Sequence, residues 1–160
     1  MAKFEIKSDK KNVHVYLKFS GEIDEDANFA GAEISGADEI DVDFQEINSI
    51  NSCGVRELYK WVESIPTRIK VNYLFCHEII IGQFNMVAGL LKANIKVKSF
   101  YTPYFCEVCN VRTEVLFSAG TDFNGANVRE LQDVKCHKCS GPTAIDVIEN
   151  SYFKFLQWQG

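Results

Sequence analysis

The sequence contains no long run of apolar residues. No stretch approaches the ~20 apolar residues that a membrane-spanning helix needs, so we expect no membrane span. The first 15 residues also lack an apolar run of signal-peptide length. We therefore expect a cytoplasmic protein, in which thiols stay reduced and paired cysteines favour a metal site over disulfides.

Motifs of the common enzyme classes are also missing. The sequence has no glycine-rich phosphate loop and no HExxH zinc motif. Its three histidines, His14, His77 and His137, fall in no recognisable constellation with a nucleophile or a carboxylate pair. We therefore predict that the protein is not an enzyme.

Positive charge is scarce as well. The formal net charge is −5, and residues 101–160 hold five Lys or Arg against seven Asp or Glu. A nucleic-acid-binding module would carry a basic stripe, so nucleic acid is disfavoured as a partner. Residues 19–55 contain ten Asp or Glu and no Lys or Arg. This acidic stretch is either a surface that a protein partner reads or an ordinary solvated surface.

Hydrophobic periodicity predicts an α/β fold. Alternation with a period of two predicts strands, and apolar residues at spacings of three and four predict helices. The two types of element alternate along the chain, which indicates a mixed or parallel sheet packed on helices. The expected strands are 3–11, 13–19, 39–44, 69–75 and 95–100, and the expected helices are 24–36, 55–65, 78–91 and 148–158.

The character of the sequence changes after residue 100. We take Tyr101–Pro103 as the boundary between an N-terminal domain, residues 1–100, and a C-terminal part, residues 101–160. The helix expected at 148–158 is rich in aromatic residues. We expect it to pack on the sheet or on the rest of the C-terminal part; an exposed aromatic face that forms an oligomer is the alternative.

Four cysteines form two pairs in the C-terminal part. Cys106-x-x-Cys109 and Cys136-x-x-Cys139 are separated by 26 residues. Two such turns point four thiolates at one place, which suits one tetrahedral Zn²⁺. The pattern resembles a zinc ribbon, in which the metal is structural because four protein ligands leave no position for water or substrate. His137 is expected to be an exposed turn residue and not a ligand.

Two segments of the N-terminal domain carry a further pattern. Phe19–Asp24 reads FSGEID, and residues 42–55 run from a strand through Ile50-Asn51-Ser52-Cys53-Gly54 into a helix. They resemble the STAS family, named for sulphate transporters and anti-sigma-factor antagonists, in which a strand ends in Gly-Glu-Leu-Asp and a later strand leads through Asp-Ser-Ser/Ala-Gly into a helix. The resemblance covers residues 3–100. It implies a STAS-like mixed β-sheet packed on helices, followed here by a small zinc-ribbon subdomain and a C-terminal helix.

The resemblance also implies a function. The protein would be a non-catalytic regulator like an anti-sigma-factor antagonist, acting in a partner-switching pathway on an anti-sigma factor or a serine kinase. The serine that matches Ser52 is the phosphorylation switch in many members. The expected partner-binding residues are Asp24, Asn51, Ser52, Cys53 and Gly54. Asn51 stands where the family has an acidic residue, which leaves kinase recognition of Ser52 open.

The residues by themselves leave a second function open. Ser52 or Asn51 stands where a helix N-cap is needed, so Ser52 has either a regulatory or a purely capping role. In the latter case the chain is a constitutive structural or scaffold adaptor, whose zinc ribbon mediates protein binding and less readily nucleic-acid binding. The two remaining cysteines, Cys53 and Cys76, are expected to be buried or half-buried and unreactive.

Overall fold

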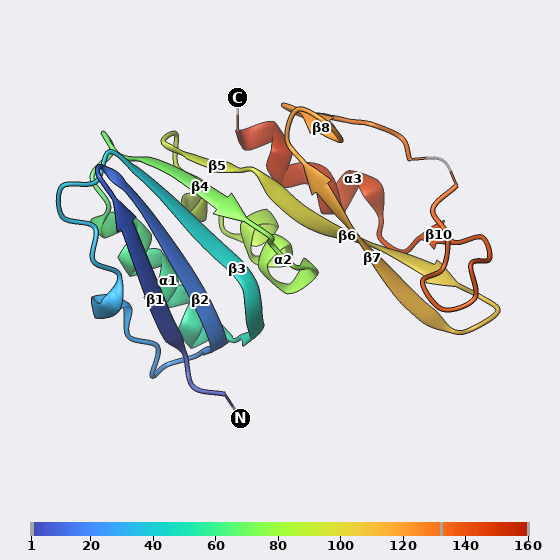
Figure 1. The fold of residues 1–160 in the computed structure, drawn as a ribbon, viewed down its shortest axis with the longest axis horizontal. Coiled ribbons are helices and arrows are strands. Elements are labelled where there is room, and N and C mark those ends of the chain that lie inside the picture. Colours follow the sequence, from blue (N-terminus) through green and yellow to red (C-terminus); the bar gives the residue numbers. More distant parts are fainter. Residues whose placement is uncertain (1, 132, 160) are drawn as a thin grey trace.

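A five-stranded mixed sheet forms the larger part of the molecule. The structure, a computed structural model, describes residues 2–131 and 133–159. In the strand order β1-β2-β3-β4-β5, β1 runs antiparallel to β2 and the other neighbours are parallel, which confirms the predicted mixed α/β architecture (Figure 1). The strands are β1 (Glu5–Lys11), β2 (His14–Ile23), β3 (Glu39–Ile50), β4 (Lys70–Leu74) and β5 (Ile95–Val97).

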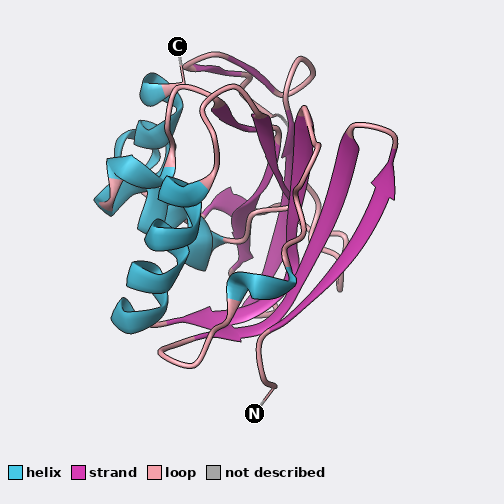
Figure 2. Cartoon of the chain, turned by 90° about the vertical axis from the view of Figure 1, so that its left-hand side faces the viewer, coloured by secondary structure: helices cyan, strands magenta, loops and turns pink. Residues whose placement is uncertain are grey.

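Helices cover one face of this sheet, as Figure 2 shows. α1 (Ser52–Ser64) follows β3, and α2 (Glu78–Met86) follows β4. The alternation in β2 sends Leu17 and Phe19 to this face, where both are fully buried. Phe19 packs edge-on against Trp61 of α1. None of the helices that the structure describes is long and apolar enough to cross a membrane.

A smaller three-stranded sheet, in the order β10-β6-β7, continues from the edge of the first. Phe100 of β6 packs against the rings of Phe117, Phe123 and Phe155. These rings belong to the same apolar cluster as the core under the first sheet. The strands of this region are β6 (Ser99–Cys106), β7 (Val111–Ser118) and β10 (Ala144–Ile145), with β8 (Phe123–Asn124) and β9 (Asn127–Val128) in a separate ladder.

The expected domain boundary lies inside β6. The strand predicted at 95–100 divides into β5 and β6, and β6 passes through Tyr101–Pro103 without ending. Cys76, just after β4, forms a parallel bridge with Phe100. The division into residues 1–100 and 101–160 stays a prediction, while the apolar core extends across it.

The helix predicted for residues 24–36 is wrong. The segment contains only a short 3₁₀ helix, η1 (Phe29–Gly31), between turns. Asp24 Oδ1 and Asn28 Oδ1 each accept a hydrogen bond from the backbone N–H two residues further on, both at 2.9 Å. Such local bonds compete with helical ones, which is why short polar side chains favour turns.

α2 is shorter than the predicted helix 78–91. It ends at Met86, and a separate 3₁₀ helix, η2 (Ala88–Leu90), follows. Gly89 lies against the ring of Tyr59 on α1, and a Cβ at this position would be 2.6 Å from the ring. The chain therefore leaves the helical path where the glycine lets it approach α1 closely.

The C-terminal helix is also only partly regular. α3 (Glu149–Tyr152) leads directly into a 3₁₀ helix, η3 (Phe153–Trp158). Phe155 and Leu156 are fully buried, which confirms the predicted packing of this segment on the core. Ile148, which the helical pattern places in the same apolar stripe, is instead 76% exposed.

Candidate functional site

The two cysteine pairs lie in turns of the same local conformation. The N–H that follows each pair donates to the carbonyl of the pair's first cysteine at 2.9 Å, from Asn110 to Cys106 and from Ser140 to Cys136. Asn110 and Ser140 have φ angles of 54° and 62°, in the left-handed region. Each turn thereby folds its two side chains toward one side, as a thiolate-lined metal site requires.

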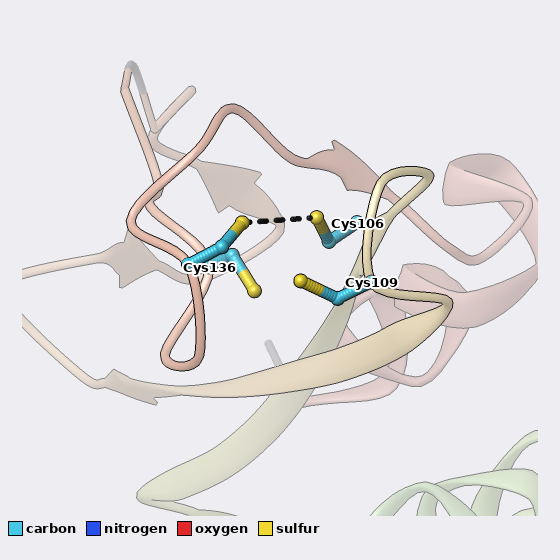
Figure 3. A group of neighbouring side chains, drawn as sticks. Cys106, Cys109 and Cys136 are labelled. Carbon is cyan, nitrogen blue, oxygen red and sulfur yellow. Dashed lines mark hydrogen bonds between the residues drawn. The ribbon is translucent and has the colours of Figure 1, made fainter.

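The four thiols converge on one point. One Sγ each from Cys106, Cys109, Cys136 and Cys139 lie within 4.8 Å of one another, and the Sγ atoms of Cys106 and Cys139 are 3.6 Å apart. Figure 3 shows Cys106 and Cys109 facing the turn that carries Cys136. Sulfur atoms bound to one tetrahedral metal at about 2.3 Å lie about 3.8 Å apart. The cluster therefore has the size of a metal site, and a metal ion can bind there.

Electrostatics favour a cation at this point. Backbone N–H groups of Cys139 and Lys138 lower the pKa of the Cys136 thiol to about 6. The hydrogen bond to Cys139, together with desolvation of the thiolate form, raises the pKa of the Cys109 thiol to about 12. Neighbouring thiols therefore resist simultaneous ionisation, and a bound cation would remove that resistance by neutralising their charge.

His137 stays outside the cluster. Its side chain is exposed, as expected, and a hydrogen bond of 2.9 Å joins its Nδ1 to the Thr113 hydroxyl. The backbone N–H of His137 donates to the same Thr113 oxygen at 3.1 Å. These bonds attach the second cysteine turn to β7, and His137 is not one of the clustered metal-ligating groups.

The N-cap of α1 is Asn51, not Ser52. Its Oδ1 accepts from the Gly54 N–H at 2.8 Å, and its Nδ2 donates to Glu25 Oε2 at 3.1 Å. Hydrogen bonds from the Glu25 backbone N–H and from Asn51 lower the pKa of Glu25. β3 runs on to Ile50, beyond the predicted end at residue 44, and delivers Asn51 to this position. Ser52 is the first helical residue, and its side chain is exposed.

The predicted partner-binding residues come together around this helix end. The Asn51 N–H donates to the Ile23 carbonyl at 3.2 Å. A Cβ on Gly54 would lie 1.9 Å from that carbonyl oxygen and 2.9 Å from the backbone nitrogen of Asp24. Glycine thus allows α1 to begin directly against the end of β2, which brings Asp24 next to residues 51–54.

The two cysteines outside the cluster have different environments. Cys53 is exposed, so its predicted burial is wrong; it stands in the first turn of α1, beyond the apolar face. Cys76 is fully buried, as predicted. Burial raises the pKa of the Cys76 thiol well above its ordinary value, which keeps it protonated and unreactive.

A groove beside Ile50 was not visible in the sequence. It has a volume of about 780 Å³, and its apolar lining includes Ile50, Ile79 and Ile148. Arg112 bridges two acidic groups at its rim, Glu78 at 2.9 Å and Asp146 at 2.8 Å. These residues come from four separate segments of the chain. No local sequence pattern could therefore indicate the groove.

Replacing the cap residue tests the geometry of this helix end. Asn51→Ala should lower the free energy of unfolding by about 1 kcal/mol, because the Gly54 N–H loses its acceptor. Asn51→Ser should lower it less, because a serine hydroxyl still caps the helix without placing a second negative charge beside Glu25. Urea denaturation of the two variants measures the difference, and equal losses would contradict the capping role.

Comparisons with known proteins add no family. Neither the search against protein-family models nor the search against curated proteins found a match. The STAS resemblance and the functions that it implies therefore stay predictions.

Proposed function

We propose that the protein is a non-catalytic regulatory binding module that resembles an anti-sigma-factor antagonist and is switched by phosphorylation of Ser52. The observation that carries the proposal is the exposed Ser52 at the start of α1, next to the loop that contains Asp24. Its partner would be an anti-sigma factor or a serine kinase. The fold proposed for residues 3–100 is STAS-like.

The charge around Ser52 supports a switch. A phosphate there adds about −1.5 to −2 charges, and the helix N-terminus stabilises it. Asp24, Glu25 and Asp26 form no ion pair within the described parts of the chain, whereas Lys18 and Lys70 pair with other residues of the acidic stretch. Phosphorylation would therefore strengthen an already negative surface and repel a partner that meets it with acidic groups.

The groove next to this surface supports protein binding. Ile50 lines it and directly precedes Asn51, so the groove begins two residues before Ser52 along the chain. Ile79 and Ile148 are 39% and 76% exposed there. An apolar side chain of a partner would fill such a groove, while the charged groups around it would fix the partner's orientation.

The cysteine cluster is proposed to hold one structural Zn²⁺. Four thiolates are soft ligands, and their spacing fits a tetrahedral ion. With Cys106, Cys109, Cys136 and Cys139 as ligands, no coordination position is left for a substrate. The metal would hold the two cysteine turns together, in a region with few buried apolar side chains of its own.

A constitutive scaffold adaptor is the second candidate, and one observation favours it. Val108, inside the first cysteine turn, is 79% exposed. An exposed apolar side chain on a turn that a metal would make rigid suits a permanent protein contact. In this case Ser52 has no regulatory role, and the cysteine-rich end carries the binding.

Variants of Ser52 distinguish the two candidates. We expect Ser52→Asp to weaken capture of the partner by about tenfold or more, and Ser52→Ala to leave it unchanged, because only the aspartate adds repulsive charge. Each variant is immobilised, and proteins captured from lysate of the cells of origin are quantified by mass spectrometry. Ser8→Asp, which changes an exposed serine on β1, is the matched control. Equal capture by all variants would eliminate the switch and favour the adaptor.

A further inference from the structure

The sheet face opposite the helices carries a second group of metal-ligating side chains. His14 on β2 and Glu39 and Asp41 on β3 each offer one ligand atom, and these atoms lie within 4.8 Å of one another. His14 Nε2 and Asp41 Oδ2 are 2.9 Å apart. Neighbouring ligands of one octahedral metal, bound at about 2.1 Å, lie about 3.0 Å apart. The pair thus has the separation of two ligands on one ion.

Asn72 on β4 points independently to a cation at this place. Its side chain extends toward Glu39 and Asp41, and the residue is only 5% exposed. The Nδ2 group donates to Glu39 Oε2 at 2.7 Å and to Asp41 Oδ1 at 2.8 Å. Asn72 Oδ1 is buried and has no hydrogen-bond partner among the described residues. A buried amide oxygen without a partner is costly, so Asn72 carries an unused acceptor that a cation between the carboxylates can bind once the amide turns Oδ1 toward it.

Rotation of the carboxamide connects these observations. Half a turn of the Asn72 amide exchanges its two ends and turns Oδ1 toward the carboxylates. Three acceptor groups facing one another repel unless a positive ion lies between them. In the metal-free protein the NH₂ group takes the place of the cation. In the metal-bound protein Oδ1 becomes a ligand, and its bond to the metal replaces the two hydrogen bonds that the NH₂ group gives up.

The surroundings leave room for an ion with water. A pocket of about 270 Å³ opens beside the cluster, lined by Asp9, Lys11, His14, Tyr16 and Asp41. The two carboxylates of Glu39 and Asp41 balance the charge of a dication. Lys70 Nζ is 3.9 Å from Glu39 Oε2, with 58% of its side chain exposed, so the lysine is free to withdraw into solvent.

We propose that His14, Glu39, Asp41 and Asn72 form a binding site for a divalent transition-metal ion. One imidazole nitrogen among oxygen ligands suits Mn²⁺, Fe²⁺ or Zn²⁺ better than Mg²⁺ or Ca²⁺, which prefer oxygen alone. Unlike the four-cysteine cluster, this site leaves coordination positions to water. The proposal is independent of the Ser52 switch, since the residues lie on the face away from the helices.

Manganese tests the site in the zinc-loaded full chain. Mn²⁺ prefers oxygen and nitrogen ligands to thiolates, so it leaves the cysteine cluster undisturbed. Titration into ¹⁵N-labelled protein should broaden the resonances of the Asn72 side-chain amide and the backbone amides of Tyr16 and Asp41 first, in one saturable step. Broadening spread evenly over exposed carboxylates, or none at millimolar Mn²⁺, would overturn the proposal.

Two variants and a matched control assign the ligands. Asp41→Asn and His14→Gln should each weaken Mn²⁺ binding by about tenfold or more, while each keeps a polar side chain of similar size. Glu46→Gln removes an exposed carboxylate from the same strand, β3, and should leave the affinity unchanged. The His14 side chain is 44% exposed, so His14→Gln should fold even if Asp41→Asn does not. Wild-type affinity in His14→Gln would show that His14 and Asp41 form only an ion pair.

Discussion

Cys136→Ser is expected to release the metal and to unfold residues 133–143. This segment is mostly exposed, and Cys136 is the only buried residue among residues 133–143, all of which the structure describes. Structural zinc sites bind with about 10–16 kcal/mol, far more than the few apolar contacts of such a loop supply. Metal analysis should find no zinc in the variant, and hydrogen exchange should show loss of protection at the cysteine turns.

The same variant should leave the large sheet folded. Phe100, Phe117 and Phe155 connect β6, β7 and η3 to the main core through ring contacts that do not involve the metal. Protection of β2 to β4 should therefore persist. Cys53→Ser, which changes an exposed cysteine outside the cluster, is the control and should retain zinc. Zinc retention by Cys136→Ser would contradict the four-thiolate site.

Gly54→Ala is expected to be the most destabilising single methyl addition at the helix end. The added Cβ would lie 1.9 Å from the Ile23 carbonyl oxygen, so α1 must move away from β2. Overpacking of this kind typically costs about 1–3 kcal/mol, and occasionally more, in the free energy of unfolding. The displaced helix would also separate Ser52 from Asp24, and binding of the partner should weaken along with stability.

Gly82→Ala provides the matched comparison. Gly82 is in the middle of α2, and a Cβ there meets no atom within 4 Å. Alanine in place of glycine inside a helix should raise the free energy of unfolding by about 0.5–1 kcal/mol. Urea denaturation of both variants should therefore give shifts of opposite sign. Similar stability of Gly54→Ala and wild type would show that α1 and β2 are not in close contact.

Most of the correct predictions came from hydrophobic periodicity and from the spacing of the cysteines. Alternation in residues 13–19 depends on burial of one face, and β2 buries Leu17 and Phe19 accordingly. The two Cys-x-x-Cys turns have the same local geometry because each is closed by short-range bonds, which a sequence pattern captures. These segments are predictable because the period-two alternation and the cysteine spacing are both visible in the sequence itself.

The failures have two different causes. The turns in residues 24–36 arise where acidic and amide side chains bond to the local backbone, a competition that apolar spacing does not record. The site around His14 requires the pairing of β2 with β3 and of β3 with β4, which joins residues up to 58 positions apart. The groove at Ile148 likewise depends on how the C-terminal segment crosses α2.

In the proposed function, a zinc-stabilised module carries a phosphorylation switch at Ser52. Intact mass spectrometry of the protein from its own cells, under native and then denaturing conditions, tests it most directly. The native mass should include one zinc ion, and the denatured mass should include one phosphate that fragmentation assigns to Ser52 in some growth states. A chain without phosphate in growing, stationary and stressed cells, or with its cluster cysteines joined as disulfides, would contradict the proposed function.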